Sequence, residues 1–375
     1  MLALRIIPNK SKETNMKITY IVEDFSENGG VERIVTEKAN TLATEYGHEV
    51  SVVSVYDDKR KELYHLDESI KMVHLGVPFA DKHHGKLIKL ISRTNTLMTA
   101  ARRLNKTIKS LQPDIIFFTT TLGALLLPLC HTKARKIYES HLARPFTPYH
   151  RMFSIMERKA DTVVCLTNGD AMEYSNARRT LVIPNFIKKP AKKVEDYSVK
   201  RAIAVGRLEE QKGFLPLIDH WKDIARLHPD WHLDIYGDGS QCDMLQAEIE
   251  RLGMQEHITL CGRSNNIMDV YPQYSLHIMP SLYEGQPMAL IEAQSCGLPS
   301  VVFDFDFGAS DIVRNGYNGI IVEQSHYSLL IKGITTMMDS EALRRQYGDN
   351  AIAGSHAYYK ENVFGKWIQL LNPDR

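Results

Sequence analysis

The chain alternates short apolar runs with amphipathic stretches, and it does so twice. In the first half the apolar runs are KITYIVEDF, HEVSVVSVY, DIIFFTT, RKIYES, DTVVCLT and TLVIPN, the first of them beginning at Lys17. Such runs, separated by helical spacing, are typical of a parallel sheet covered by helices on both faces. The pattern therefore predicts a doubly wound α/β domain over residues 16–185, preceded by a tail at 1–15.

The same pattern restarts at RAIAVGR, from Arg201 onward. A basic, polar stretch separates the two halves and is expected to be a linker over residues 186–200. The strands WHLDIYG, ITLCG, SLHIMPS, SVVFDF and GIIVE, with helices between them, including one expected over 266–274, predict a second such domain over 201–357. A last helix is expected over 358–375. The predicted fold class is α/β, with two Rossmann-like domains facing a central cleft at the carboxyl ends of their strands.

Composition excludes several classes of protein. Forty-six basic residues stand against 45 acidic ones, so bulk attraction to nucleic acid is not expected. The five cysteines are widely spaced and form no zinc-type pairs, which indicates reduced thiols in the cytoplasm. The longest apolar run, ALLLPLC, is too short to span a bilayer. No metal and no cofactor are expected.

The segment EGQPMALIE, from Glu284 to Glu292, places a carboxylate on each side of a helix start. Pro287 is expected at the first helical position, where a missing N–H costs nothing. Glu284 then lies in the loop ahead of the helix and Glu292 lies inside it. Because a helix N-terminus is a natural phosphate site, this trio could hold a polyol, a phosphate and a sugar, which a nucleotide-sugar combines.

Arg207 and Lys212 follow the first strand of the second half, in VGRLEEQKG. Two cations at a carboxyl strand end suit a diphosphate leaving group, whose negative charge grows as the glycosidic bond breaks. The alternative is a solvated surface pair that is balanced by Glu209 and Glu210.

Two features of the first half are candidates for the same site. Gly29 and Gly30 follow a strand and precede a helix, so that nearby N–H groups could face phosphate; the alternative is an ordinary turn. His141 follows RKIYES at a carboxyl strand end and could bind a sugar hydroxyl, although a lone histidine is more often structural. No GxGxxG fingerprint is present, which disfavours a dehydrogenase.

The runs VGRLEEQKG, IYGDGS, LCGRSNN, MPSLYEGQPMALIEAQSCGLPSVVFD and NGYNGIIVE together resemble family 4 of the retaining glycosyltransferases, which have the GT-B fold. The resemblance covers residues 16–375 and is strongest in the second half. It implies that Glu284 faces the transferred sugar, that Glu292 holds the ribose hydroxyls, and that Arg207 and Lys212 bind the diphosphate. His141 would lie beside the sugar. The expected donor site also includes Gly29, Gly30, Gly206, Gly262, Arg263, Gly285, Gln286, Pro287, Met288 and Ala289.

By the same resemblance the chain would transfer a hexose or N-acetylhexosamine, with retention, from a UDP-sugar to a hydroxyl of a glycan or lipid-linked glycan in cell-surface polysaccharide assembly. The residues do not separate glucose from galactose or their N-acetyl forms. Two other functions stay open: a UDP-sugar epimerase of the same fold, and a nucleotide-sugar-binding protein without catalysis.

A basic stretch at residues 82–111 carries no acidic residue, and its apolar residues recur at helical spacing. It could lie on an anionic membrane surface, which would make the protein peripheral on the membrane's inner face. Equally, it could form a pair of ordinary helices whose apolar face packs on the sheet and whose basic face is solvated.

Overall fold

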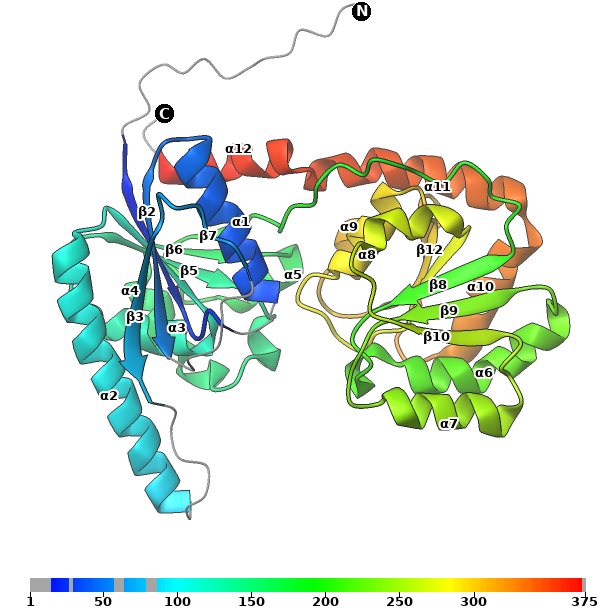
Figure 1. Cartoon of the computed structure of the whole chain (residues 1–375), viewed down its shortest axis with the longest axis horizontal. Coiled ribbons are helices and arrows are strands. Elements are labelled where there is room, and N and C mark those ends of the chain that lie inside the picture. Colours follow the sequence, from blue (N-terminus) through cyan, green and yellow to red (C-terminus); the bar gives the residue numbers. More distant parts are fainter. Residues whose placement is uncertain (1–14, 27–29, 57–63, 79–85, 373–375) are drawn as a thin grey trace, which may run out of the picture. The chain divides into compact units, whose positions relative to one another are not determined.

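The computed structural model describes residues 15–26, 30–56, 64–78 and 86–372, with the backbone alone for 86–90. The chain forms two compact units, each with its own parallel sheet (Figure 1). Unit 1 comprises Met1–Cys165 and Glu173–Leu181, and unit 2 comprises Leu166–Met172 and Val182–Arg375. The segment expected to be a linker lies within unit 2.

Unit 1 is built on a seven-stranded sheet of order β3-β2-β1-β4-β5-β6-β7, in which the strands from β3 to β6 pair in parallel. Its strands are β1 Lys17–Val22, β2 Glu49–Tyr56, β3 Lys71–Val77, β4 Ile115–Thr119, β5 Arg135–Ser140, β6 Thr162–Cys165 and β7 Thr180–Val182. The helices that accompany it are α1 Gly30–Thr44, α2 Lys86–Leu111, α3 Thr120–Leu126 and α4 Phe153–Lys159, whereas α5, Asn168–Glu173, lies almost wholly in unit 2.

Two features of unit 1 differ from the sequence prediction. The strand β3 was not predicted, because its sequence KMVHLGV mixes polar and apolar residues and only two of its seven residues are buried. Residues 86–111 of the basic stretch form one helix, α2, rather than a pair, and residues 82–85 lie outside the described residues. Its C-terminal half buries Ala101, Leu104 and Ile108, so this part of its apolar face packs within unit 1.

Unit 2 is built on a six-stranded parallel sheet of order β10-β9-β8-β11-β12-β13. Its strands are β8 Arg201–Val205, β9 His232–Tyr236, β10 Ile258–Gly262, β11 Leu276–Met279, β12 Ser300–Asp304 and β13 Gly319–Glu323. Its helices are α6 Phe214–Leu227, α7 Cys242–Leu252, α8 Met288–Ser295, α9 Ala309–Ile312, α10 Tyr327–Asp339, α11 Glu341–Ser355 and α12 Lys360–Leu371.

The prediction of a helix over 266–274 is wrong. Two 3₁₀ turns, Ile267–Asp269 and Tyr271–Gln273, occupy that segment. Pro272 lacks an N–H and follows directly on the first turns, so a continuous α-helix would lose a hydrogen bond there. Tyr271, in the second turn, is fully buried and anchors the segment in the core.

The C-terminal helices close unit 2. Helix α11 packs against α8, where Gly348 is buried beside the Tyr197 hydroxyl and the Gly297 carbonyl. Arg344, also buried, donates through its guanidinium to the carbonyl oxygens of Tyr197, Met337 and Met338. These contacts hold the segment before β8 against helices α10 and α11.

We expect Gly348→Ala to destabilise unit 2 by about 1–3 kcal/mol, the range for overpacking a well-packed interior. A Cβ at Gly348 would lie 2.1 Å from the Tyr197 hydroxyl and 2.4 Å from the Gly297 carbonyl oxygen. Gly354→Ala, on the same helix, is the control, because its Cβ would meet only Asn318 Nδ2 at 3.5 Å. Denaturant unfolding of both variants measures the difference, and equal stabilities would contradict this packing.

Candidate active site

The loops that follow β8, β9 and β10 are joined backbone to backbone. Leu208 N donates to Asp238 O at 2.9 Å, and Gly237 N donates to Gly262 O at 2.9 Å. A Cβ at Gly237 would lie only 1.8 Å from the carbonyl oxygen of Gly206, so the two loops approach more closely than any side chain allows. These contacts make a single rigid rim at the carboxyl ends of three neighbouring strands.

Lys212 and Glu284 meet at this rim. Lys212 Nζ lies 2.6 Å from Glu284 Oε1, and the two side chains are 13% and 8% exposed. The lysine stem lies over Gly206, where a Cβ would come within 3.1–3.2 Å of its methylene groups. The pair therefore joins the loop after β8 to the loop after β11, two strands that lie side by side.

Gln211 connects these residues to Arg207. Its side-chain oxygen accepts from Arg207 Nη2 at 3.3 Å, and its Nε2 donates to Tyr283 O at 2.6 Å. Its backbone oxygen accepts from Leu282 N at 2.8 Å. The structure thus brings Arg207, Lys212 and Glu284 together. Sequence reasoning missed Gln211, although its place between two candidate cations was a signal.

The start of α8 differs by one residue from the prediction. Pro287 is the N-cap, with φ −77° and ψ 84°, and the helix begins at Met288. The error arose because proline also suits the extended position ahead of a helix. No side chain caps the first turn of α8. Its first N–H groups, at Met288 and Ala289, thus make no capping bond to a side chain and can face an anion.

The residues ahead of α8 are held by neighbouring loops. Gln286 Oε1 accepts from Asn185 N at 2.7 Å. The Pro287 ring lies against Gly308, where a Cβ would come within 3.0 Å of Pro287 Cδ. Gly285, between Glu284 and Gln286, is half-buried. These two contacts hold the turn that precedes α8 in place.

Glu292 is half-buried one turn inside α8. Its charge acts on Tyr271, whose pKa is raised well above its usual range by burial first and by Glu292 second. The Tyr271 hydroxyl donates to Ala289 O at 3.1 Å. Burial also raises the pKa of the Cys296 thiol to about 12, with a smaller contribution from Glu292. Glu292 therefore lies on the same side of the helix as these two groups.

The loop after β10 supplies the two remaining candidates of unit 2. Gly262 has φ +67° and accepts from Gly237 through its carbonyl, so it forms part of the rim. Arg263 follows it and is exposed.

The other candidates belong to unit 1. Gly30 begins α1, and Gly29 lies outside the described residues. His141 follows β5, and its Nε2 lies 3.1 Å from Glu139 Oε2, with 6% of the side chain exposed. The structure describes each unit by itself, so the cleft expected between the two domains stays a prediction.

Two features are absent from the described residues, a metal site and a membrane-spanning helix. They contain no group of three or more His, Cys, Asp or Glu side chains arranged to hold a metal ion. None of the helices found there combines the length and the apolar character needed to cross a bilayer.

Comparisons with known proteins show which families and solved structures this chain resembles. The family described as Glycosyl transferases group 1 matches residues 185–353, and Glycosyltransferase Family 4 matches residues 28–189. Among solved structures, sucrose-phosphate synthase from Thermosynechococcus elongatus aligns with a TM-score of 0.80 at 15% identity, over 96% of this chain and 99% of that one. The Anabaena protein HepE, solved in complex with UDP and glucose, aligns with a TM-score of 0.72 at 19% identity, over 96% and 100%.

The chain is a glycosyltransferase of the GT-B fold. Among curated relatives, an uncharacterized glycosyltransferase of Haemophilus influenzae is 26% identical over 95% of this chain and 99% of its own length. The amylovoran biosynthesis glycosyltransferase of Erwinia amylovora is 26% identical over 95% and 99%. The UDP-Gal:alpha-D-GlcNAc-diphosphoundecaprenol alpha-1,3-galactosyltransferase of Escherichia coli is 25% identical over 89% and 91%. The prediction of a hexosyltransferase with the GT-B fold is confirmed.

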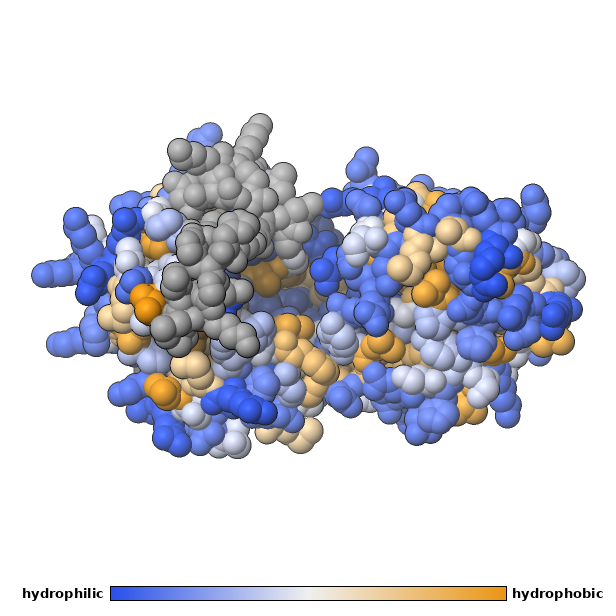
Figure 2. Space-filling view, turned by 90° about the horizontal axis from the view of Figure 1, so that it is seen from below, coloured by the Kyte–Doolittle hydropathy of each residue, from blue (hydrophilic) through white to orange (hydrophobic). Residues whose placement is uncertain are grey.

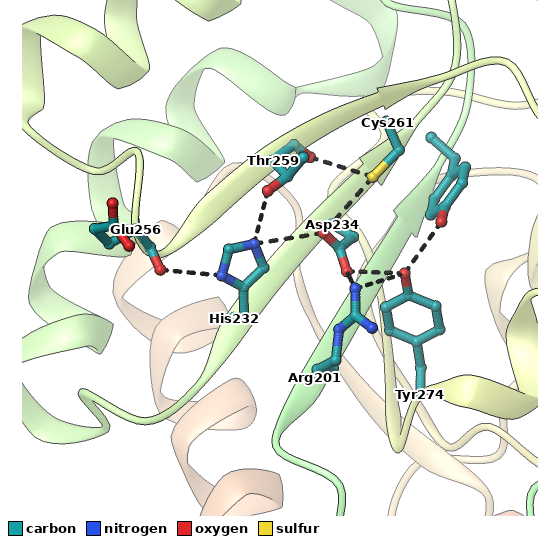
Figure 3. Close-up of polar contacts among 8 residues, drawn as sticks. Arg201, His232, Asp234, Glu256, Thr259, Cys261 and Tyr274 are labelled. Atoms are coloured by element: carbon teal, nitrogen blue, oxygen red, sulfur yellow. Dashed lines mark hydrogen bonds and ion pairs between the residues drawn. The ribbon is translucent and has the colours of Figure 1, made fainter.

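The glycosyltransferase carries a second polar cluster on its unit 2 sheet, apart from the rim (Figure 3). Asp234, on β9, binds Arg201 and accepts from the Tyr274 hydroxyl at 2.8 Å. His232 Nδ1 faces Glu256 O at 3.1 Å, and its Nε2 lies 3.4 Å from Asp234 Oδ1. The hydrogen bond to Asp234 raises the pKa of His232, against a smaller opposing effect of burial. Burial alone would raise the pKa of Asp234, but His232, Tyr274 and Arg201 together lower it.

This cluster makes stability depend on pH in a definite direction. Because the folded pKa of His232 is above its unfolded value of about 6.5, its contribution is complete below that value and is lost as the pH rises through the folded pKa. Because the folded pKa of Asp234 is lowered, its contribution is present above about pH 3.9 and is lost in acid.

We therefore expect His232→Gln to lower the free energy of unfolding more at pH 5.5 than at pH 8.5, as measured by urea unfolding. His326→Gln is the control, because its contact with Glu323 is largely exposed, at 54% and 72%, and contributes little. An equal loss for His232→Gln at both pH values would rule out the charged contact with Asp234.

Proposed function

We propose that this glycosyltransferase moves a hexose or N-acetylhexosamine from a UDP-sugar to a hydroxyl of a glycan or lipid-linked glycan, with retention of configuration, in cell-surface polysaccharide assembly. The observation that carries the proposal is the contact between Lys212 and Glu284, one cation and one carboxylate held together at the rim. A nucleotide-sugar needs both, because its diphosphate is anionic and its sugar hydroxyls are hydrogen-bond donors.

Each part of the site takes one part of the donor. Glu284 accepts hydrogen bonds from the sugar hydroxyls, and Glu292 accepts from the ribose hydroxyls. Lys212 and Arg207 bind the diphosphate, together with the uncapped first turn of α8. The low exposure of Lys212 and Glu284 strengthens these contacts, because less water competes for them.

The reaction follows from this arrangement. The bond between the anomeric carbon and the phosphate oxygen breaks, and the electron pair stays on the diphosphate. Arg207, Lys212 and the α8 dipole stabilise the negative charge that develops there, without a metal. The acceptor oxygen bonds to the anomeric carbon on the same face through an oxocarbenium-like pair, and its proton passes to the departing phosphate oxygen. The expected first-domain partner of the sugar is His141.

The choice of donor and acceptor class rests on the relatives. The E. coli relative is named for UDP-galactose and a diphosphoundecaprenol acceptor, and the Anabaena structure holds UDP and glucose. The Erwinia relative is named for amylovoran biosynthesis. A UDP-sugar donor agrees with the E. coli and Anabaena names, a lipid-linked acceptor with the E. coli name, and polysaccharide assembly with the Erwinia name.

The two other functions make different predictions in one assay. UDP release that depends on an added acceptor indicates a transferase, and a changed sugar without net release indicates an epimerase. Binding of UDP-sugar with neither product indicates a protein without catalysis. The curated relatives are named as transferases, which disfavours the other two functions.

We expect Arg207→Ala and Lys212→Ala each to lower turnover about a hundredfold or more, because losing one cation that stabilises developing charge costs about 3–4 kcal/mol of barrier. Steady-state UDP release with saturating donor measures this. Near-normal turnover in either variant would remove the role assigned to that residue.

Matched controls separate catalysis from folding. Arg226→Ala removes a similar cation from α6, where its ion pair with Asp223 is exposed, and we expect normal turnover. Lys212→Ala leaves Glu284 buried without this partner, so its thermal unfolding must be compared with that of Arg207→Ala, whose side chain is exposed.

We also propose that α2 contacts the anionic surface of the membrane that holds the acceptor. Its exposed basic residues include Arg102, Lys106 and Lys109, and Ile91 and Met98 are exposed at 53% and 41%. Since the C-terminal half of the helix buries its apolar face, attraction there would come mainly from charge. Figure 2 shows a face of the molecule on which apolar residues occur in small, separated groups.

We expect Arg102→Glu/Lys106→Glu/Lys109→Glu to abolish co-sedimentation with vesicles that contain anionic lipid. Wild-type protein should bind these vesicles at low salt and lose binding at high salt, because salt screens the attraction. It should not bind neutral vesicles, which lack the anionic charge. The control is Lys332→Glu, a charge reversal on α10 in unit 2. Wild-type binding that is absent, or that salt does not change, would leave α2 as an ordinary packed helix.

A further inference from the structure

Unit 1 buries a cluster of charged side chains next to His141. Lys38, from the third turn of α1, reaches Glu139 near the end of β5, and the side chains are 2% and 3% exposed. The same carboxylate oxygen, Glu139 Oε2, lies 3.1 Å from His141 Nε2. One buried carboxylate oxygen therefore receives both a lysine and a histidine.

The carboxylate is held in its charged form. Burial alone would raise the pKa of Glu139, but Lys38 and His141 together lower it. The charge of Glu139 also acts on Tyr20. Burial raises the pKa of the Tyr20 hydroxyl most, and Glu139 raises it further. Lys38 lies 5.7 Å from the centre of the Tyr20 ring. Because taking a single charge out of water is costly, Lys38 makes an ionised Glu139 possible at this depth.

An ionised carboxylate can only accept hydrogen bonds, and this fixes the partner nitrogen. His141 must carry a proton on Nε2 to donate to Glu139. In the neutral ring Nδ1 then has a lone pair, and among the described residues Nδ1 has no hydrogen-bond partner. The ring is thus set to accept a proton or a hydroxyl hydrogen bond through Nδ1.

We propose that Glu139, anchored by Lys38, is a positioning residue that fixes His141 in the Nε2–H tautomer and leaves Nδ1 as an acceptor for a hydroxyl of the transferred sugar or the acceptor. This rests on the proposed function, in which His141 lies beside the sugar. Neither Lys38 nor Glu139 need touch the substrate. Their effect reaches it through the orientation and tautomer of one imidazole ring.

Lys38→Met/Glu139→Leu tests the device, because replacing a buried ion pair by apolar side chains of similar volume often costs little stability. Glu139→Gln would not serve, since its amide oxygen can take the place of Oε2 and accept from both Lys38 and His141. The double variant removes the acceptor of the His141 Nε2–H, so the Nε2–H tautomer is no longer favoured. The matched control is Glu157→Gln in the same unit: Glu157 is fully buried, accepts from Arg144 Nε at 2.9 Å and has no contact with His141.

The direct readout is the nitrogen NMR spectrum of histidine-labelled enzyme, in which His141→Asn identifies the signal among 15 histidines. We expect Nε2–H in the neutral ring of wild type and of Glu157→Gln, and a loss of that preference in Lys38→Met/Glu139→Leu. Finding Nδ1–H in wild type would overturn the proposal without any variant having to fold. An unchanged tautomer in Lys38→Met/Glu139→Leu would overturn it as well.

The second readout is kinetic. We expect Lys38→Met/Glu139→Leu to lower kcat about 10- to 100-fold with little change in KM for the donor, the loss typical when the partner that orients a metal-binding histidine is removed. Glu157→Gln should keep its kcat. A shifted tautomer with normal kcat would overturn the positioning role. If wild type shows no acceptor-dependent UDP release, the proposed function fails instead, and the tautomer still reports on the cluster by itself.

Discussion

The backbone contact between the loops after β8 and β9 is the constraint on which the donor side of the enzyme depends. Gly237 lies so close to the Gly206 carbonyl that a Cβ there would fall 1.8 Å from its oxygen. At Gly239 a Cβ would fall 2.5 Å from the Leu208 carbonyl oxygen. Only glycine permits such an approach, and it leaves no space for the loops to shift independently. Lys212 and Arg207 are thus presented from one rigid rim.

Each unit also buries a lysine–glutamate pair at the carboxyl end of its sheet, and the two pairs differ in access to solvent. Lys212 and Glu284 are 13% and 8% exposed, so a ligand can reach both charges. Lys38 and Glu139 are 2% and 3% exposed, and they act through a neighbour. A buried pair is costly to form and costly to break, which suits groups whose positions must not change. In the two proposals, the same chemistry would serve binding in one unit and positioning in the other.

Sequence reasoning predicted most of the fold, and it singled out Arg207, Lys212 and Glu284, which the structure brings together, because both depend on local patterns. The strands of the two sheets were apolar runs, and the residues of EGQPMALIE are consecutive. It missed β3, in which polar and apolar residues mix and only two residues are buried, and it extended a helix across Pro272. It also missed Lys38 and Glu139, which lie 101 residues apart. A lysine on an amphipathic helix is usually solvated, so nothing local distinguishes one that the fold buries.

The pairing of Lys212 with Glu284 also decides how charge is divided in the donor site. An ammonium group has three donors, so Lys212 can keep Glu284 and still reach a phosphate oxygen. In the free enzyme its charge is shared with that carboxylate, so the pair attracts a diphosphate less than a lone lysine would. Arg207 differs, because it is exposed and donates a hydrogen bond to the neutral Gln211. In the proposed function the first attraction for the diphosphate would therefore come mainly from Arg207 and the start of α8, whereas Lys212 would stabilise the charge that develops on the leaving group.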